Sequence, residues 1–270
     1  MLNLQALNQL NPLWIVRKLD ELRWKKDYKF NFSSYSILEI GPYYNPTFSG
    51  DNVRYFDVYD RDEILRRARE KGANERDVPA CIHFLSPTAD LSIVSGTYDI
   101  IFASHCIEHQ PDLISHLNQV SKLLSDGGVY IVRAPDKRYC FDYYSPPTEL
   151  SDVIAAFEEK RTIHSLNSIL RNRVYKTHNK SVLHWLGFHQ SKRYEGRNSL
   201  IPAAVEEYRQ SKQAQSYIDS HAWQFTPHSF AAITKDLYEL KYIDLYPIKK
   251  YNTLPFLFTF GVYLQKAQAR

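Results

Sequence analysis

Residues 36–46 read SILEIGPYYNP, and the fold class and the first candidate site both follow from this stretch. Ser36 to Ile40 form a short apolar run that is typical of a buried strand, yet Glu39 stands one step before its end. Gly41 follows directly, and glycine can adopt backbone angles and close approaches that other residues cannot. We predict that this turn holds the charged tail of a small cofactor, with the Glu39 carboxylate facing a cationic group.

Strands and helices alternate from residue 35 onward, which predicts an α/β fold with a mostly parallel sheet covered on both faces. The run 98–103, YDIIFA, has the continuous apolar character of a strand that is buried on both sides. Strands are predicted at 36–40, 53–58, 81–85, 98–103, 129–132, 242–246 and 256–264. Helices are predicted at 62–71, 111–124 and 229–240.

Two segments flank or interrupt this core. Residues 1–34 contain a predicted helix that begins at Asn11-Pro12 and packs on the main domain; lying on a membrane surface is the alternative. Residues 144–220 carry helical patterns at 150–160, 166–175 and 201–218, which predict an insertion over the carboxyl edge of the sheet. The core then comprises residues 35–143 and 221–270.

Composition favours a cytoplasmic protein with a real hydrophobic core. The net charge of +4 is too weak to indicate nucleic-acid binding, and the three cysteines are expected to be free thiols. We expect no signal peptide, and the longest apolar run, 254–264, is too short for a membrane span. The spacing of His178, His184 and His189 matches no zinc pattern, so no metal site is expected. No feature indicates an oligomeric state.

Carboxylates recur at the ends of successive predicted strands. Ligands bind beyond the carboxyl ends of the strands in an open parallel sheet. Asp57 ends the second strand, where a carboxylate can accept hydrogen bonds from ribose hydroxyls. Asp90 follows the third strand, where its side chain can accept from an adenine amino group. The order of these acids along the chain suits a nucleoside ligand.

Four stretches together resemble the class I S-adenosylmethionine-dependent methyltransferases, and in particular a bacterial group found beside polysaccharide-assembly genes. They are LEIGPYYNP, the acid in YFDVYD, YDIIFASHCIEH, and LLSDGGVYIVRAPDKRYCFD. The resemblance covers about residues 35–143 and, more loosely, 221–267. It implies a Rossmann-like sheet of seven strands with the last one antiparallel, and S-adenosylmethionine as the cofactor. The cofactor-binding residues it implies are Glu39, Gly41, Pro42, Tyr43, Asp57, Asp90 and Ser104.

The chain departs from the family pattern at the first turn. Tyr43 stands where the family usually has a second glycine, and the crossover 41–52 is too short for a full helix. A dinucleotide-binding fold would need three glycines in a GxGxxG turn that opens a helix around a pyrophosphate, and only Gly41 is present. A cofactor without a diphosphate therefore fits this turn better.

Candidate catalytic and acceptor-binding residues follow the fourth and fifth strands and the insertion. Histidine is the usual base for an alcohol near neutral pH, which makes His105 the first catalytic candidate. Asp136 and His221 are further catalytic candidates. Substrate-binding candidates are His109, Lys137, Arg138 and Trp223. For each of these a structural role, such as capping a turn or packing in the core, is the alternative.

The acceptor class rests on the resemblance and on one local charge imbalance. Between residues 160 and 197 there are nine lysines and arginines and a single acid, Glu195. This stretch favours an anionic acceptor, so we expect O-methylation of a hydroxyl on a saccharide or related small anionic metabolite. A methyltransferase acting on RNA or protein, and a non-catalytic cofactor-binding module, are the alternatives.

Overall fold

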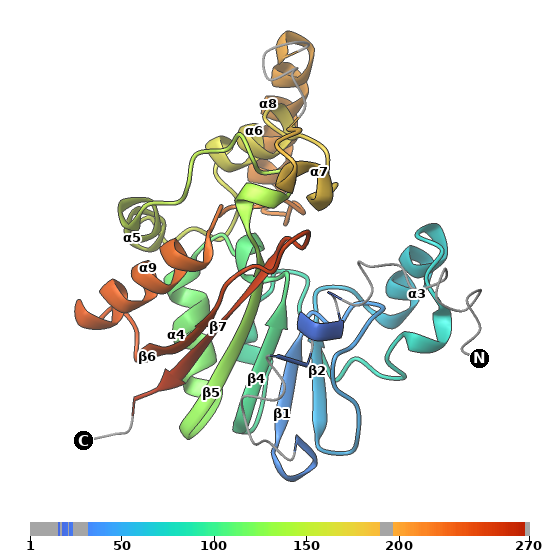
Figure 1. Ribbon diagram of the computed structural model, residues 1–270, viewed down its shortest axis with the longest axis vertical. Helices are drawn as coiled ribbons and strands as arrows, with labels where there is room; N and C mark the ends of the chain where they lie inside the picture. The colour runs from blue at the N-terminus through green and yellow to red at the C-terminus, as the bar shows by residue number, and fades with distance from the viewer. Residues whose placement is uncertain (1–15, 17, 21, 24–31, 190–196, 268–270) are drawn as a thin grey trace, which may run out of the picture.

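The computed structural model describes residues 16, 18–20, 22–23, 32–189 and 197–267 (Figure 1). Seven strands form one sheet in the order β3-β2-β1-β4-β5-β7-β6. The strands are β1 Ile37–Ile40, β2 Val53–Asp57, β3 Phe84–Leu85, β4 Tyr98–Ser104, β5 Leu124–Pro135, β6 Leu245–Tyr251 and β7 Thr259–Lys266. The α-helices are α3 Arg61–Glu70, α4 Leu113–Leu123, α5 Leu150–Glu158, α6 Leu166–Val174, α7 Ser181–Trp185, α8 Arg197–Ala214 and α9 Pro227–Glu239.

The topology confirms the fold class predicted from the sequence. Strands β1 to β5 pair in parallel, and β7 runs antiparallel to both β5 and β6. The strand order reverses between β1 and β4, which is where ligands bind in open α/β sheets. Ile40 is in register with Phe56 of β2 and with Ala103 of β4. The residues that follow these three positions therefore meet at one edge of the sheet.

Strand bounds differ from the sequence prediction most at β3, at β5 and at β6, which is predicted at 242–246 and runs from Leu245 to Tyr251. β3 is only two residues long, because it lies at the sheet edge and pairs with β2 alone. β5 begins at Leu124 and extends to Pro135, since β4 and β7 pair with it on its two sides. A single-sequence pattern does not contain this partner information, so strand ends are its weakest prediction.

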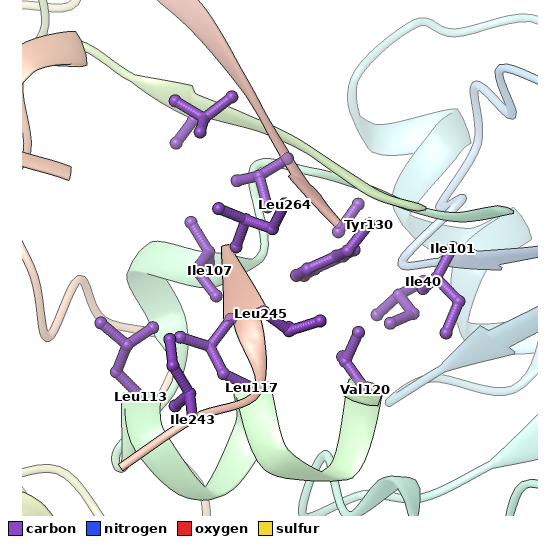
Figure 2. Packing of buried hydrophobic residues seen from close by; sticks show 14 of the residues in the cluster. Ile40, Ile101, Ile107, Leu113, Leu117, Val120, Tyr130, Ile243, Leu245 and Leu264 are labelled. Atoms are coloured by element: carbon purple, nitrogen blue, oxygen red, sulfur yellow. The ribbon is translucent and has the colours of Figure 1, made fainter. Parts of the chain in front are cut away.

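One face of the sheet packs against α4 and α9 in a continuous hydrophobic core (Figure 2). The apolar side chains of helix α4 face the sheet, and Leu113, Leu117 and Val120 are fully buried there. The residues labelled in Figure 2 come from the sheet, from α4 and from the chain around them: Ile40, Ile101, Ile107, Leu113, Leu117, Val120, Tyr130, Ile243, Leu245 and Leu264. This core fixes the β1 and β4 ends that carry the candidate site.

The opposite face of the sheet is covered by chain before and after β1. Phe48 of the crossover packs edge-on against Phe102 of β4. Residues 16, 18–20 and 22–23 are helical, and Asp20 pairs with Arg133 of β5, so this segment contacts the main domain. The start of the helix predicted at residues 11–12 lies outside the described residues. Two side chains of its predicted apolar face, at positions 19 and 22, are exposed rather than buried.

The helices of the insertion lie mostly beyond the ends of the central strands (Figure 1). Helices α6 and α8 pack on each other there, whereas α5 packs on α4 and adds Val153 and Ala156 to the main core. Within the described part of the chain, no helix combines the length and apolarity that crossing a bilayer requires.

Candidate active site

A cavity of about 280 Å³ lies at the carboxyl ends of β1, β2 and β4. It adjoins a more open cavity of about 780 Å³, and both are bounded by Tyr59, Arg67, Tyr217 and Asp219. Residues that line the smaller cavity are Ile40, Gly41, Tyr43, Phe56, Asp57, Val58, Tyr59, Arg67, Ala89, Ser104, His105, Cys106, His109, Gln110, Tyr217 and Asp219. Six of these are site residues predicted from the sequence: Gly41, Tyr43, Asp57, Ser104, His105 and His109.

The turn after β1 has the left-handed backbone that the sequence suggested. Gly41 has a φ of +67°, and a Cβ built on it would lie 2.4 Å from Cys106 Sγ. Tyr43 takes a φ of +50° although it is not glycine. Its ring packs with the rings of Tyr44 and Tyr59 against α3, so it forms a wall of the cavity. A left-handed tyrosine is costly, and neighbouring contacts must hold it.

Asp57 supplies one of those contacts. Its carboxylate accepts hydrogen bonds from the backbone N–H of Tyr43 (3.2 Å) and of Tyr59 (3.0 Å). Asp57 is 3% exposed, and burial raises the pKa of its carboxyl, while the backbone donors act in the opposite direction. The side chain both fixes the turn and presents a carboxylate to the cavity.

The carboxylate of Glu39 is hydrogen-bonded to the crossover between β1 and β2. Its two carboxylate oxygens accept from the backbone N–H of Thr47 (2.7 Å) and of Phe48 (3.0 Å). The crossover 41–52 contains no helix, as predicted, so its amides need acceptors other than helical carbonyls. Glu39 and the buried Pro42 do not line the cavity. Glu39 thus holds the loop that shapes the site.

Asp90 lies behind the cavity wall. It caps the short 3₁₀ helix Leu91–Ile93 by accepting from Ser92, and Gln119 of α4 donates to it at 2.7 Å. Its neighbour Ala89, with a φ of +58°, lines the cavity instead. At this strand end Ala89, and not the predicted carboxylate of Asp90, borders the cavity.

His105 occupies the floor of the cavity directly after β4. It has a φ of +56°, and its Nε2 lies 3.1 Å from Thr259 Oγ1 of β7. Its Nδ1 lies 3.5 Å from Oε1 of the buried Glu108, and its side chain is 36% exposed. A half-exposed imidazole with a carboxylate behind one nitrogen is suited to move a proton at the other.

The end of the segment 144–220 contributes Tyr217 and Asp219 to the lining of the cavity. Asp219 Oδ1 lies 3.1 Å from His109 Nδ1, which joins the insertion to the loop after β4. This contact with His109 lowers the pKa of the Asp219 carboxyl to about 2. Sequence reasoning missed Asp219 and Tyr217, because nothing near them in the chain indicates a site. It also missed Arg67, whose guanidinium lies 3.9 Å over the Tyr59 ring.

The residues predicted after β5 lie outside the cavity. Asp136 is fully buried and accepts from Arg138 and from Thr253 Oγ1 (2.7 Å). Lys137 donates to the carbonyl of Tyr143 at 3.1 Å. These contacts brace the loop after β5.

The two residues predicted where the insertion returns to the core are both buried. Trp223 donates to the carbonyl of Gln110 (2.6 Å) within the main core. His221 Nδ1 lies 2.5 Å from Asp142 Oδ2, and its ring meets the ring of His109 edge-on. Burial lowers the pKa of His221, but the Asp142 carboxylate outweighs burial and the pKa is raised.

The sheet order β3-β2-β1-β4-β5-β7-β6, with β7 antiparallel, is a Rossmann-like arrangement. A family model described as a methyltransferase domain matches residues 17–230. The match spans most of the chain, and the chain therefore belongs to this methyltransferase family. No curated protein matches the chain.

Solved structures with a similar fold are methyltransferases. One from Aquifex aeolicus is 9% identical, with a TM-score of 0.43, and the match covers 92% of this chain and 90% of that one. One from Mesorhizobium loti is 13% identical, with a TM-score of 0.42 and coverage of 86% and 91%. The CurJ carbon methyltransferase is 15% identical, with a TM-score of 0.37; 86% of this chain matches 48% of that one, so this chain spans about half its length.

Proposed function

We propose that this chain transfers the methyl group of S-adenosylmethionine to a hydroxyl of a saccharide or related small anionic metabolite. The observation that carries this proposal is that Asp57 and His105 line one cavity at the ends of adjacent strands. One residue suits the ribose of the cofactor and the other suits the proton of an alcohol.

The residues around the cavity fit such a cofactor. The buried Asp57 uses its two oxygens for one backbone N–H each, which leaves acceptor capacity for ribose hydroxyls. Gly41 lets the turn pack against Cys106 at the edge of the cavity, and Tyr59 and Tyr43 offer aromatic walls. When bound, S-adenosylmethionine supplies a methyl group on a positively charged sulfonium.

His105 is the proposed base. Glu108 behind Nδ1 favours the proton on that nitrogen, which leaves Nε2 as the basic atom. Nε2 would accept the hydroxyl proton of the acceptor, and the bound cofactor would supply the methyl group to the hydroxyl oxygen. The acceptor hydroxyl would replace Thr259 Oγ1, now 3.1 Å away, as the hydrogen-bond partner of Nε2.

The walls of the adjoining cavity support the proposal that the acceptor is a saccharide with negative charge. Tyr59 and Tyr217 border it, and tyrosine offers a flat apolar face with a polar tip, which suits sugar rings. Arg67 and Arg173 also border it, with Arg173 paired to Glu207 at 2.8 Å, and a guanidinium group suits a phosphate or carboxylate. With the motif resemblance, this supports a place in the bacterial group found beside polysaccharide-assembly genes.

Calorimetry with S-adenosylhomocysteine, the demethylated product, tests the cofactor site. Asp57→Ala should weaken binding by about 1–3 kcal/mol, because ribose hydroxyls lose a charged acceptor. Asp60→Ala is the matched control: Asp60 caps α3 by accepting from Glu63 and does not line the cavity. Equal affinity in the wild type and Asp57→Ala, or no binding to the wild type, would contradict the proposal. Product formation with a panel of phosphorylated and neutral sugars then tests the acceptor class.

A further inference from the structure

Glu108 is a buried carboxylate with no hydrogen-bond partner for either oxygen among the described residues. It is 1% exposed. Removing a carboxylate from water without hydrogen bonds costs several kcal/mol, so a compensating charge is required. Three imidazoles surround its Oε1: His105 Nδ1 at 3.5 Å, His109 Nε2 at 3.9 Å and His221 Nε2 at 4.0 Å.

Two of these histidines carry a second carboxylate on their far nitrogen. His221 Nδ1 lies 2.5 Å from Asp142, and His109 Nδ1 lies 3.1 Å from Asp219. A carboxylate beside Nδ1 keeps the imidazole proton on Nδ1. The lone pair of Nε2 then points out on the opposite side of the ring. In the neutral imidazoles both Nε2 lone pairs therefore face the Glu108 carboxylate. Three electron-rich groups then converge on one point, and either protons on the imidazoles or a metal ion must balance them.

We propose that Glu108, His109 and His221 bind a divalent first-row transition metal ion of the Zn²⁺ type. Their ligand atoms all lie within 4.8 Å of one another. Ligands at 2.0–2.1 Å in tetrahedral geometry are about 3.3–3.4 Å apart. The Glu108 distances of 3.9 Å and 4.0 Å to His109 and His221 must therefore shorten by about 0.6 Å, and the distance between the two histidine ligand atoms by at most about 1.4 Å. Two imidazoles and a carboxylate suit such ions, whereas Mg²⁺ and Ca²⁺ prefer oxygen ligands alone.

The outer contacts match those of metal sites. Histidine ligands usually donate their other N–H to a carboxylate, which fixes the ring and raises its basicity. Asp142 stands in that position for His221, and Asp219 Oδ1 lies 3.1 Å from His109 Nδ1 without the angle of a hydrogen bond. The ligands come from segments far apart in the chain, which explains why histidine spacing alone gave no metal site.

The ion would lie at the wall of the cavity, because His109 and Asp219 line it. Three protein ligands leave at least one coordination position for an oxygen. The presence of the ion does not depend on the proposed function. The use of the ion does rest on the proposed function: it would hold the acceptor oxygen near His105 and make that hydroxyl more acidic.

Zn²⁺ titration of the chelator-treated, dialysed full chain by calorimetry tests the site, with Co²⁺ absorption as a second readout. The wild type should bind one Zn²⁺ per chain. Glu108→Gln and His221→Asn should each weaken binding by more than about 100-fold. Asp142→Asn, which keeps every ligand, should weaken it by about 10- to 100-fold. Thermal unfolding and S-adenosylhomocysteine binding check that each variant is folded.

His189→Asn is the matched control. His189 belongs to a separate group of histidines, where its Nδ1 lies 3.0 Å from His184 Nδ1. Zn²⁺ binding that survives Glu108→Gln but is lost in His189→Asn would overturn the proposal. So would a wild type that takes up no Zn²⁺, since protons on the imidazoles then balance Glu108. Zn²⁺ binding that depends on Glu108, without any S-adenosylhomocysteine binding, would support the metal site and contradict the proposed function.

Discussion

Replacing Gly41 by alanine should destabilise the protein for two separable reasons. The first is backbone strain, since a φ of +67° costs an L-residue about 1–2 kcal/mol. The second is steric, because the new Cβ would lie 2.4 Å from Cys106 Sγ. That sulfur already contacts the carbonyl oxygens of Ile40 at 3.4 Å and Ser104 at 3.3 Å, so it has little room to retreat.

Gly72 separates the two effects. It has a φ of +64°, and a Cβ built on it would meet nothing within 4 Å. Gly72→Ala therefore suffers the strain alone, offset by about 0.4–1 kcal/mol from the stiffer unfolded chain. Gly41→Ala adds the cost of overpacking, about 1–3 kcal/mol. We expect Gly41→Ala to be less stable than Gly72→Ala by that amount.

A double-mutant cycle with Cys106→Ala identifies the clashing atom. In the Cys106→Ala background, Gly41→Ala should cost about as much as Gly72→Ala does, because only the strain remains. Urea unfolding followed by circular dichroism gives the free energies, provided that the slopes agree among variants. A coupling between positions 41 and 106 below about 0.5 kcal/mol would refute the reasoning and show that the sulfur rotates away.

Three further predictions test other parts of the structure. Glu39→Gln should lower the free energy of unfolding by about 1–3 kcal/mol in urea, because an amide accepts only one of the two backbone N–H groups; an unchanged value contradicts this. Burial lowers the pKa of His116 from 6.5 to about 4, so the folded state favours neutral imidazole and its stability contribution is lost as pH falls from 6.5 towards 4. His116→Gln should remove this loss, so that the free energy of unfolding falls by at most about 3 kcal/mol less between pH 6.5 and 4 than in the wild type. His105→Ala should reduce turnover by about 10²–10⁴-fold while S-adenosylhomocysteine affinity changes little; equal losses in both would place His105 with the cofactor.

Most of the sheet could be predicted because local pattern and buried position agree. The run around Ile101 is apolar on both sides, and it becomes the central β4, fully buried. The spacing of Leu113 and Leu117 likewise identifies α4. The apolar side chains at positions 19 and 22 are exposed, whereas Asp20 of the same segment is buried and paired with Arg133. An ion pair across the chain carries no local periodicity.

The candidate site could be predicted only where it follows strand ends. Asp57 and His105 lie in the cavity because parallel strands bring their carboxyl ends to one edge. Asp219 reaches the same cavity through the fold of the insertion, and Glu108 meets His221 only in three dimensions. Sequence order alone does not encode such contacts.

One physical cause explains both the scarcity of glycine at the first turn and the two buried acids beside it. A glycine-rich turn that opens a helix leaves its free N–H groups at the helix start, where they can bind an anion. Here no helix follows β1, and the free N–H groups of the crossover are taken up by Glu39 and Asp57 instead. Those amides are therefore not available for a diphosphate. Of the two acids only Asp57 lines the cavity, so a carboxylate and not a row of free amides borders the space beside Gly41.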